Sequence, residues 1–185
     1  MREHLALVVC GAPLAARCHD VAARAVEAGW VVRVVATPSA MSWVDAAQVE
    51  QVTGCAVLME HRQPWQAKRF PPPAQVIVCP ATFNTVNKLA AGIMDNYATG
   101  LLCEALAART PMTIAPMVNN RLWSHPAWQH SLGMLAAAGV RFIDIRTGHA
   151  GRPAAVQSGT GGEVIAAFDP AWVLAPAGGQ PAQKS

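Results

Sequence analysis

Short apolar runs alternate with longer segments of mixed apolar and polar residues along most of the chain. A continuous apolar run is typical of a strand that helices cover on both faces. The pattern predicts six such strands, at residues 5–10, 30–36, 55–59, 75–79, 112–115 and 140–145. Helices are predicted between them, at about residues 14–28, 42–54, 82–108 (as one or two helices), 126–138 and 163–168.

Local signals mark several of these helix ends. Gly29 is suited to a left-handed cap after the first helix, and Ser42–Asp45 resembles a capping box before the second. Asp95 is a candidate cap within 82–108, and Pro126 suits the first turn of the following helix. Two segments break the pattern: residues 61–73 are rich in proline, and residues 147–162 are rich in glycine.

Strand and helix alternate at spacings that imply a parallel sheet with right-handed crossovers. The predicted fold is therefore α/β, a three-layer doubly wound parallel sheet. We expect one domain over residues 1–170. Residues 171–185 are mostly Ala, Pro, Gly and Gln without a pattern, and we expect a disordered tail there.

Polar residues gather where four of the predicted strands end. They form the turns Gly11–Pro13, Thr37–Ser39, Pro80–Thr85 and Pro116–Trp123. Ligands in doubly wound folds bind beyond the carboxyl ends of the strands. These turns are rich in hydroxyls, amides and free backbone donors and poor in acids, so we expect them to form one site for a polar ligand.

A dinucleotide fits these turns poorly. The turn after the first strand has one glycine, Gly11, where the dinucleotide fingerprint needs three, and the second strand ends in Thr37 where an acid would hold the ribose diol. A phosphate-bearing mononucleotide fits better, because helix amino termini after Gly11 and Ser39 would offer backbone N–H groups to a phosphate. Thr82, Thr85 and Ser39 could add hydroxyl donors, although hydroxyls at such positions also serve as ordinary helix caps.

Composition narrows the classes of partner. Of the 185 residues, 52% are hydrophobic and 14% are charged, with a net charge of +3. That charge is weak and no basic run accompanies it, which argues against nucleic acid. No apolar run is long enough to span a membrane, so we expect no membrane partner.

The cysteines indicate a reducing compartment. Their number is odd, and they show neither close pairs nor the spacing of a zinc site: Cys10, Cys18, Cys55, Cys79 and Cys103. We therefore expect free thiols, no metal and a cytoplasmic location.

Two of the polar turns resemble motifs of a known family. Pro80-Ala81-Thr82-Phe83-Asn84-Thr85 resembles the PASANT motif, and Pro116–Trp123 (Pro-Met-Val-Asn-Asn-Arg-Leu-Trp) resembles the PxMNxxMW motif. Both motifs belong to the homo-oligomeric flavin-containing cysteine decarboxylases, which include phosphopantothenoylcysteine decarboxylase and the peptidyl-cysteine decarboxylases of lantibiotic synthesis. Gly11–Pro13 and Thr37–Ala40 are similar to that family's flavin turns, and the resemblance covers roughly residues 5–139.

The resemblance implies a Rossmann-like flavoprotein fold, FMN as cofactor, and a homotrimer or trimer-based shell that holds the flavin between subunits. It also implies a carbon–carbon lyase reaction. The flavin oxidises a substrate's cysteine side chain, and the resulting thioaldehyde readily loses its neighbouring carboxylate. The substrate would be a small molecule or a peptide with a carboxylate, contacted by Asn119. The motifs and turns assign flavin contacts to Gly11, Ala12, Thr37, Ser39, Pro80, Ala81, Thr82, Asn84, Thr85 and Met117.

The chain departs from the family pattern in two places that bear on catalysis. The family's catalytic histidine would fall near Gln66, and the nearest histidine is His61, which is the candidate for that role, with Arg62 as a substitute. A solvated histidine is the competing interpretation of His61. The late loop of the pantothenate branch carries a cysteine, whereas residues 147–162 here contain none.

Three functions remain open from the sequence. The first is a flavin-dependent decarboxylase acting on a cysteine-derived or peptide C-terminal carboxylate. The second is an FMN-binding relative without that activity, with another redox role or as a non-catalytic subunit of an oligomer. The third is a flavin prenyltransferase, whose serine- and glycine-rich first turn Gly11–Pro13 fits poorly.

Overall fold

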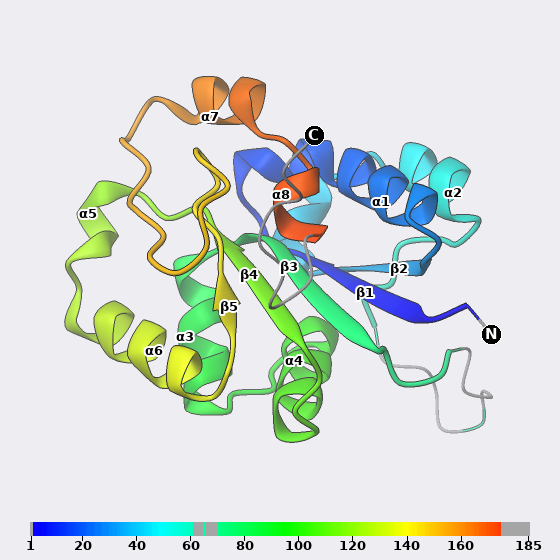
Figure 1. Cartoon of the computed structure of the whole chain (residues 1–185), viewed down its shortest axis with the longest axis horizontal. Helices are drawn as coiled ribbons and strands as arrows, with labels where there is room; N and C mark the ends of the chain where they lie inside the picture. Colours follow the sequence, from blue (N-terminus) through cyan, green and yellow to red (C-terminus); the bar gives the residue numbers. More distant parts are fainter. Residues whose placement is uncertain (1, 61–64, 66–69, 175–185) are drawn as a thin grey trace, which may run out of the picture.

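A five-stranded parallel sheet forms the centre of the molecule, with strand order β2-β1-β3-β4-β5 (Figure 1). The structure is a computed structural model that describes residues 2–60, 65 and 70–174. The predicted α/β, doubly wound fold is confirmed. The strands are β1 (His4–Val9), β2 (Val31–Ala36), β3 (Gln75–Ala81), β4 (Met112–Pro116) and β5 (Arg141–Phe142).

Helices cover both faces of this sheet (Figure 1). One layer contains the 3₁₀ helix η1 (Pro13–Arg17), α1 (Cys18–Glu27), α2 (Ala46–Thr53), α7 (Gly161–Ala167) and α8 (Ala171–Leu174). The other contains α3 (Phe83–Ala91), α4 (Tyr97–Ala107) and α6 (Pro126–Ala137). Successive residues of β1 point to opposite faces, so Leu5 and Leu7 pack in the first layer and Ala6 and Val8 in the second.

Two short helices lie directly after strands, at the edge where we expected a ligand. The 3₁₀ helix η2 (Pro38–Ser42) follows β2, and α5 (Asn120–Trp123) follows β4. The polar turn Pro116–Trp123 is therefore partly helical.

Two predicted strands are reduced in the structure. Within 55–59 only Leu58 pairs with the sheet. It forms a single parallel bridge to Val35 of the edge strand β2. Most of this segment is half-buried or exposed, so it gains little from extending the sheet. The predicted strand 140–145 narrows to β5. The Ile143 N–H still donates to the Ile114 carbonyl of β4 at 3.0 Å, but Ile143 also forms an antiparallel bridge with Ala150, and the parallel pairing ends there.

Two helix caps differ from the sequence expectation. Asp45, and not Ser42, caps α2, since its carboxylate accepts a hydrogen bond from the Gln48 N–H at 3.1 Å. Asn96, and not Asp95, caps α4 in a capping box with Thr99. In both cases the true cap is the residue next to the first helical position, where its oxygen can reach the free N–H groups.

The chain beyond residue 170 begins with a helix and not with the expected disordered tail. α8 buries Val173 completely, so at least residues 171–174 belong to the packed structure. The rest of the expected tail, 175–185, lies outside the described residues. The prediction of one domain over residues 1–170 stays a prediction.

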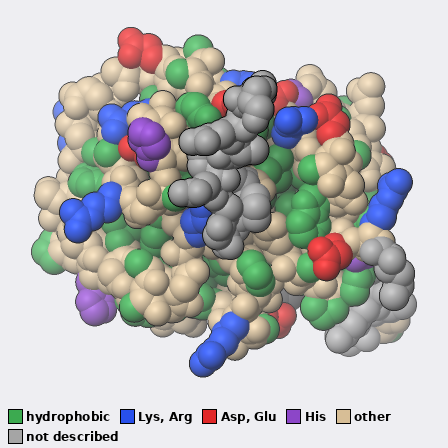
Figure 2. All heavy atoms as spheres, viewed as in Figure 1, with side chains coloured by type: hydrophobic (Ala, Val, Ile, Leu, Met, Phe, Trp, Pro, Cys, Tyr) green, Lys and Arg blue, Asp and Glu red, His purple; other side chains and the backbone are tan. Residues whose placement is uncertain are grey.

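Charge is dispersed on the face shown in Figure 2. Lys and Arg side chains lie singly among hydrophobic and polar ones on this face. Among the described residues, no helix is both long enough and apolar enough to cross a membrane.

Candidate functional site

A pocket of about 700 Å³ lies where the turns after β1, β3 and β4 meet. This volume is in the range of pockets that hold small molecules and cofactors. None of the described side chains that line it carries a charge; its polar groups are hydroxyls, amides and backbone. The lining residues are Gly11, Ala12, Pro13, Thr82, Phe83, Asn84, Met117, Val118, Asn119, Leu122, Val156, Gln157, Ser158, Gly159, Gly161 and Gly162.

The turn after β1 lies against the turn after β2. A Cβ atom at Gly11 would lie 2.7 Å from both the carbonyl oxygen and the Oγ of Ser39, closer than such atoms can approach. Only glycine therefore lets the two turns meet at this distance. The Oγ1 of buried Thr37 lies 3.3 Å from the Ser39 Oγ and holds that side chain in place.

The turns after β1, β3 and β4 are tied together by backbone hydrogen bonds. The Cys10 N–H donates to the Pro80 carbonyl at 3.1 Å, and the Met117 N–H donates to the Ala81 carbonyl at 2.8 Å. These bonds fix the three turns relative to one another at the pocket floor. The floor is thus an extension of the sheet itself.

The two threonines of the Pro80–Thr85 turn form a helix cap. The Thr82 Oγ1 accepts a hydrogen bond from the Thr85 N–H at 3.4 Å and donates to the Thr85 Oγ1 at 3.2 Å. Thr82 still lines the pocket, whereas Thr85 is buried behind it. Both hydroxyls therefore have a structural role as parts of the helix cap. Asn84 lies at the start of α3, and its exposed side chain lines the pocket.

Burial disfavours the thiolate form of the Cys10 thiol beneath this turn. Burial raises the pKa of Cys10, and hydrogen bonds with Thr85 and Thr82 offset only part of that increase. Burial also raises the pKa of Cys18 to about 11. Because the thiolate is the reactive form of cysteine, these side chains act as apolar core residues.

Asn119 has a divided role at the pocket edge. Its Oδ1 accepts hydrogen bonds from the backbone N–H groups of Arg121 (3.0 Å) and Leu122 (3.1 Å) and caps α5. This orients the side chain and leaves the Nδ2 donor outside the capping interaction. The sequence allowed Asn119 to be a local cap or a ligand contact. The geometry allows both at once, because the cap uses Oδ1 and a ligand could use Nδ2.

A second wall comes from a distant part of the chain. Val156 forms a parallel bridge with Asn119, and the Ser158 N–H donates to the Asn120 Oδ1 at 3.3 Å. Gly161, at the start of α7, packs beside Pro13 and Met117: a Cβ there would lie 3.6 Å and 3.8 Å from their side chains, at ordinary van der Waals distance. Residues 156–162 thus close the pocket opposite the strand ends.

The structure brings together six of the predicted site residues as pocket lining: Gly11, Ala12, Thr82, Asn84, Met117 and Asn119. The other five that are described lie behind or beside the lining: Thr37, Ser39, Pro80, Ala81 and Thr85. The candidates for the catalytic role, His61 and Arg62, lie outside the described residues. So does Gln66, near which the family's histidine would fall.

Sequence reasoning missed part of the lining. It assigned no contact to Phe83, Val118 or Leu122, although all three lie within the quoted motifs. It also assigned none to residues 156–162. The signal available there was the run of Gly159, Gly161 and Gly162. Gly159 has a φ of +95°, a backbone conformation that favours glycine.

An α/β sheet whose strand-end pocket has no charged side chain among its described lining residues is typical of proteins that bind nucleotides or cofactors. The chain belongs to the Flavoprotein family, whose sequence model matches residues 1–164.

Curated relatives agree with this membership. The chain is 29% identical over 150 residues to the coenzyme A biosynthesis bifunctional protein CoaBC of Thermococcus kodakarensis. The match covers 78% of this chain and 37% of that protein. It is 43% identical over 72 residues to a cysteine/cysteine sulfinic acid decarboxylase from an unknown prokaryotic organism, covering 39% of this chain and 19% of that protein. The chain thus spans less than two fifths of the length of these relatives.

Solved structures share the fold. The FMN-dependent cysteine decarboxylase SpaF matches with a TM-score of 0.62 and 30% identity, covering 76% of this chain and 83% of that one. TvaF, an FMN-dependent cysteine decarboxylase from thioviridamide biosynthesis, matches with a TM-score of 0.67 and 29% identity, covering 77% and 90%. A PPC decarboxylase mutant matches at 20% identity with a TM-score of 0.65, covering 90% and 96%, which supports the fold alone.

Proposed function

We propose that this chain binds FMN in the 700 Å³ pocket and acts as a flavin-dependent decarboxylase of a cysteine-derived or peptide C-terminal carboxylate. The observation that carries the proposal is the convergence of the motif-bearing turns on one pocket without charged lining among the described residues. The family membership and the likeness to SpaF and TvaF support it.

The residues present suit FMN. The Gly11 N–H and the Ser39 hydroxyl are donors of the kind that hold a phosphate without a cationic side chain, whereas the Ala12 N–H already donates to the Cys10 carbonyl at 2.9 Å. Thr82, Asn84 and Met117 would contact the rest of the cofactor. FMN, when bound, would accept the two electrons released as the substrate's cysteine side chain is oxidised to a thioaldehyde, from which carbon dioxide would leave easily.

Asn119 is the residue that we assign to the substrate carboxylate. Its Oδ1 is held by two N–H groups of α5, so its Nδ2 points in a fixed direction and can donate to an anion. A neutral amide orients a carboxylate without the strong stabilisation that an ion pair would give it. This matters because strong ground-state binding of the carboxylate would oppose its departure as carbon dioxide.

The proton chemistry must involve a group from elsewhere. None of the described lining residues is an acid, a base or a histidine. In the proposal this role belongs to His61, from the same subunit or from a neighbour in a trimer or trimer-based shell.

The same observation favours one alternative, an FMN-binding relative without decarboxylase activity. It would have another redox role or serve as a non-catalytic subunit of the oligomer. A chain that retains FMN but lacks a working base would show this behaviour.

The first experiment tests cofactor binding. We expect the purified protein to show the visible absorption bands of a flavin and to release FMN when it is denatured. A colourless protein that also fails to take up added FMN would contradict the whole proposal.

A charge change at Asn84 tests the assigned pocket. Asn84→Asp places a negative charge beside an anionic cofactor and removes an amide donor, and we expect FMN affinity to fall roughly tenfold or more. Gln51→Glu is the matched control, because it adds the same charge at an exposed position of α2. Equal FMN affinities in the two variants would show that Asn84 does not contact the cofactor.

The second experiment separates the two candidate functions. The FMN-loaded protein is incubated with cysteine-terminated peptides and with 4'-phosphopantothenoylcysteine, and loss of carbon dioxide is followed by mass spectrometry. Decarboxylation of any of them supports the enzyme. Intact FMN binding with no decarboxylation of any would favour the non-decarboxylating relative.

A further inference from the structure

A second pocket, of about 450 Å³, adjoins the first between α3 and α6. Phe83 and Asn84 line both pockets, so these two residues form the wall between them. The remaining lining of the second pocket is Asn87, Lys88, Ala90, Ala91, Ile93, Ala127, His130 and Ser131.

The ring of Phe83 is held firmly in this wall. It stacks on Trp128 with ring centroids 5.8 Å apart and an interplanar angle of 25°, and it meets His125 edge to face at 5.5 Å. Trp128 is fully buried and is itself packed against Trp123 at 5.3 Å. The ring of Phe83 cannot swing away without losing these aromatic contacts, so the wall is a fixed feature of the pocket.

The second pocket has the character of an apolar side chamber. Most of its lining surface is apolar, with three alanines and Ile93, although Asn87, His130 and Ser131 also line it. Lys88, the one lysine or arginine among its described lining residues, is paired with Asp95. Such a chamber would hold an aromatic or aliphatic group if it were open to the first pocket. At the position of Phe83, the PASANT motif that Pro80–Thr85 resembles has alanine, which is too small to form such a wall.

We infer that Phe83 determines substrate specificity by closing the cofactor pocket toward the second pocket. The chain then favours substrates whose group next to the terminal residue is compact, and it disfavours those with a bulky apolar group at that place. This inference rests on the proposed function. It adds the residue that sets the size limit of the substrate.

The test opens the wall and then refills the chamber behind it. Phe83→Ala removes the larger side chain of the wall and should join the two pockets beside Asn84, and Phe83→Val should do so with a smaller loss of packing. Ala127→Leu fills the second pocket from α6 without altering the lining of the first. If Phe83 closes the passage, Ala127→Leu has no effect on its own but cancels the effect of Phe83→Ala in the double variant.

Binding is measured by calorimetry on FMN-loaded protein with the peptides Gly-Gly-Ser and Gly-Trp-Ser. Serine replaces the terminal cysteine so that no turnover occurs. Opening the wall should raise the affinity for Gly-Trp-Ser relative to Gly-Gly-Ser about tenfold or more, since apolar pockets discriminate by such factors. The ratio should return to the wild-type value in the double variant Phe83→Ala, Ala127→Leu.

Failure of this inference is distinct from failure of the proposed function. If wild-type protein does not bind FMN, the proposed function is wrong. If wild-type and opened variants all bind FMN but the peptide affinity ratio does not change, the inference about Phe83 is wrong. Should Phe83→Ala fail to fold, as judged by circular dichroism, Phe83→Val decides the outcome with the same measurement and the same Ala127→Leu partner.

Discussion

The two walls of the pocket are built in different ways. The floor, formed by the turns after β1, β3 and β4, is continuous with the sheet and is fixed by backbone bonds from Cys10 to Pro80 and from Met117 to Ala81. The opposite wall, residues 156–162, is held by a few contacts to α5 and η1. A change in the floor should therefore disturb the whole site, whereas the opposite wall should loosen locally.

The largest effect is expected from a single methyl group in the floor. In Gly11→Ala the new Cβ would lie 2.7 Å from the Ser39 backbone, so one of the two turns must move. We expect a loss of about 3 kcal/mol in the free energy of unfolding, the upper part of the range for overpacked sites, and a loss of FMN binding. Urea unfolding and FMN titration measure the two effects.

Gly133 supplies the matched control for that change. It lies inside α6, and a Cβ there would meet nothing within 4 Å. Gly133→Ala should stabilise the protein by about 0.5–1 kcal/mol, because alanine favours the helix. The same substitution should thus have opposite signs at the two positions. Stabilisation by Gly11→Ala would refute the close approach of the turns after β1 and β2.

Replacing one arginine outside the pocket, Arg17, should loosen α7, which continues the second wall. The Arg17 Nη1 donates to the carbonyls of Ile165 (2.7 Å) and Phe168 (3.0 Å), at the end of α7, and its Nε donates to Asp20 at 2.6 Å. A cation there satisfies free carbonyls at a helix carboxyl end. Arg17→Met should therefore lower the free energy of unfolding by about 2 kcal/mol and increase amide hydrogen exchange in α7.

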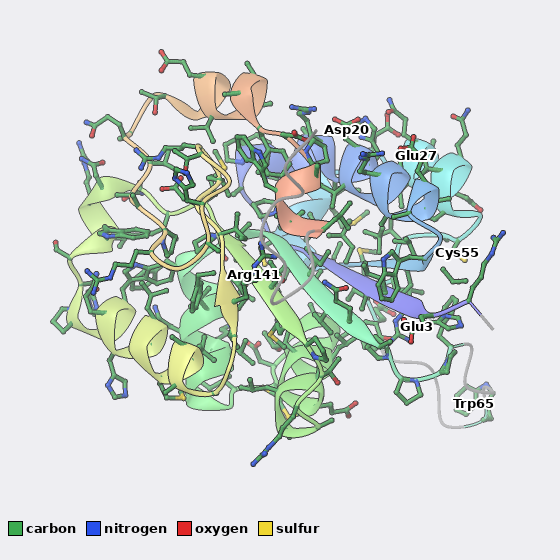
Figure 3. The ribbon with its side chains drawn as sticks, viewed as in Figure 1. Glu3, Asp20, Glu27, Cys55, Trp65 and Arg141 are labelled. Carbon is green, nitrogen blue, oxygen red and sulfur yellow. The ribbon has the colours of Figure 1, made fainter. Side chains whose placement is uncertain are left out.

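Arg24 is the control for Arg17 on the same helix layer. It pairs with Glu27 at 3.0 Å, but both side chains are more than half exposed. Figure 3 shows Asp20 and Glu27 at opposite ends of α1, with only Asp20 near the α7–α8 segment. Arg24→Met should change stability by less than about 0.5 kcal/mol. Similar exchange in α7 for both variants would show that Arg17 does not hold the second wall.

The same difference between the walls explains what the sequence could predict. The floor was predictable, because the polar residues of the Pro80–Thr85 and Pro116–Trp123 turns directly follow apolar runs, and strand ends in a parallel sheet meet at one edge. The second wall was not, because Val156 pairs with Asn119 through backbone groups alone, which leave no pattern in the side chains. The glycines near 160 did not indicate what the segment contacts, since a Cβ at Gly159 or Gly162 would meet nothing within 4 Å.

An edge effect explains one of the remaining errors. The apolar run 55–59 resembles a buried strand, yet it lies beside β2 at the border of the sheet, where a single bridge at Leu58 suffices. The two misplaced helix caps have a different cause. At each helix start several polar residues lie close together in the sequence, and the one directly before the first helical residue is the cap. Local composition does not determine that choice at Asp45 or at Asn96.

The smallest effect is expected in the loop after β5, outside both walls, and it depends on pH. Asp144 is buried, which raises the pKa of its carboxyl, but hydrogen bonds from the Arg146 side chain (3.1 Å) and N–H (2.8 Å) more than compensate, and the pKa is lowered overall. A lowered pKa in the folded state means that the ionised form stabilises the fold above the ordinary value of about 3.9. That contribution is lost as the pH falls through the lower, folded-state pKa.

Asp144→Asn should therefore cost about 1 kcal/mol of unfolding free energy at neutral pH and leave a smaller difference from wild type in acid. The loop that Asp144 closes brings Gly148 against the ring of Trp172 in α8, so the expected signature is a change in tryptophan fluorescence together with faster exchange in α8. Floor residues such as Met117 should keep their wild-type exchange rates, because their bonds belong to the sheet. A variant that speeds exchange equally in the floor, in residues 156–162 and in α8 would show that the two walls unfold as one unit.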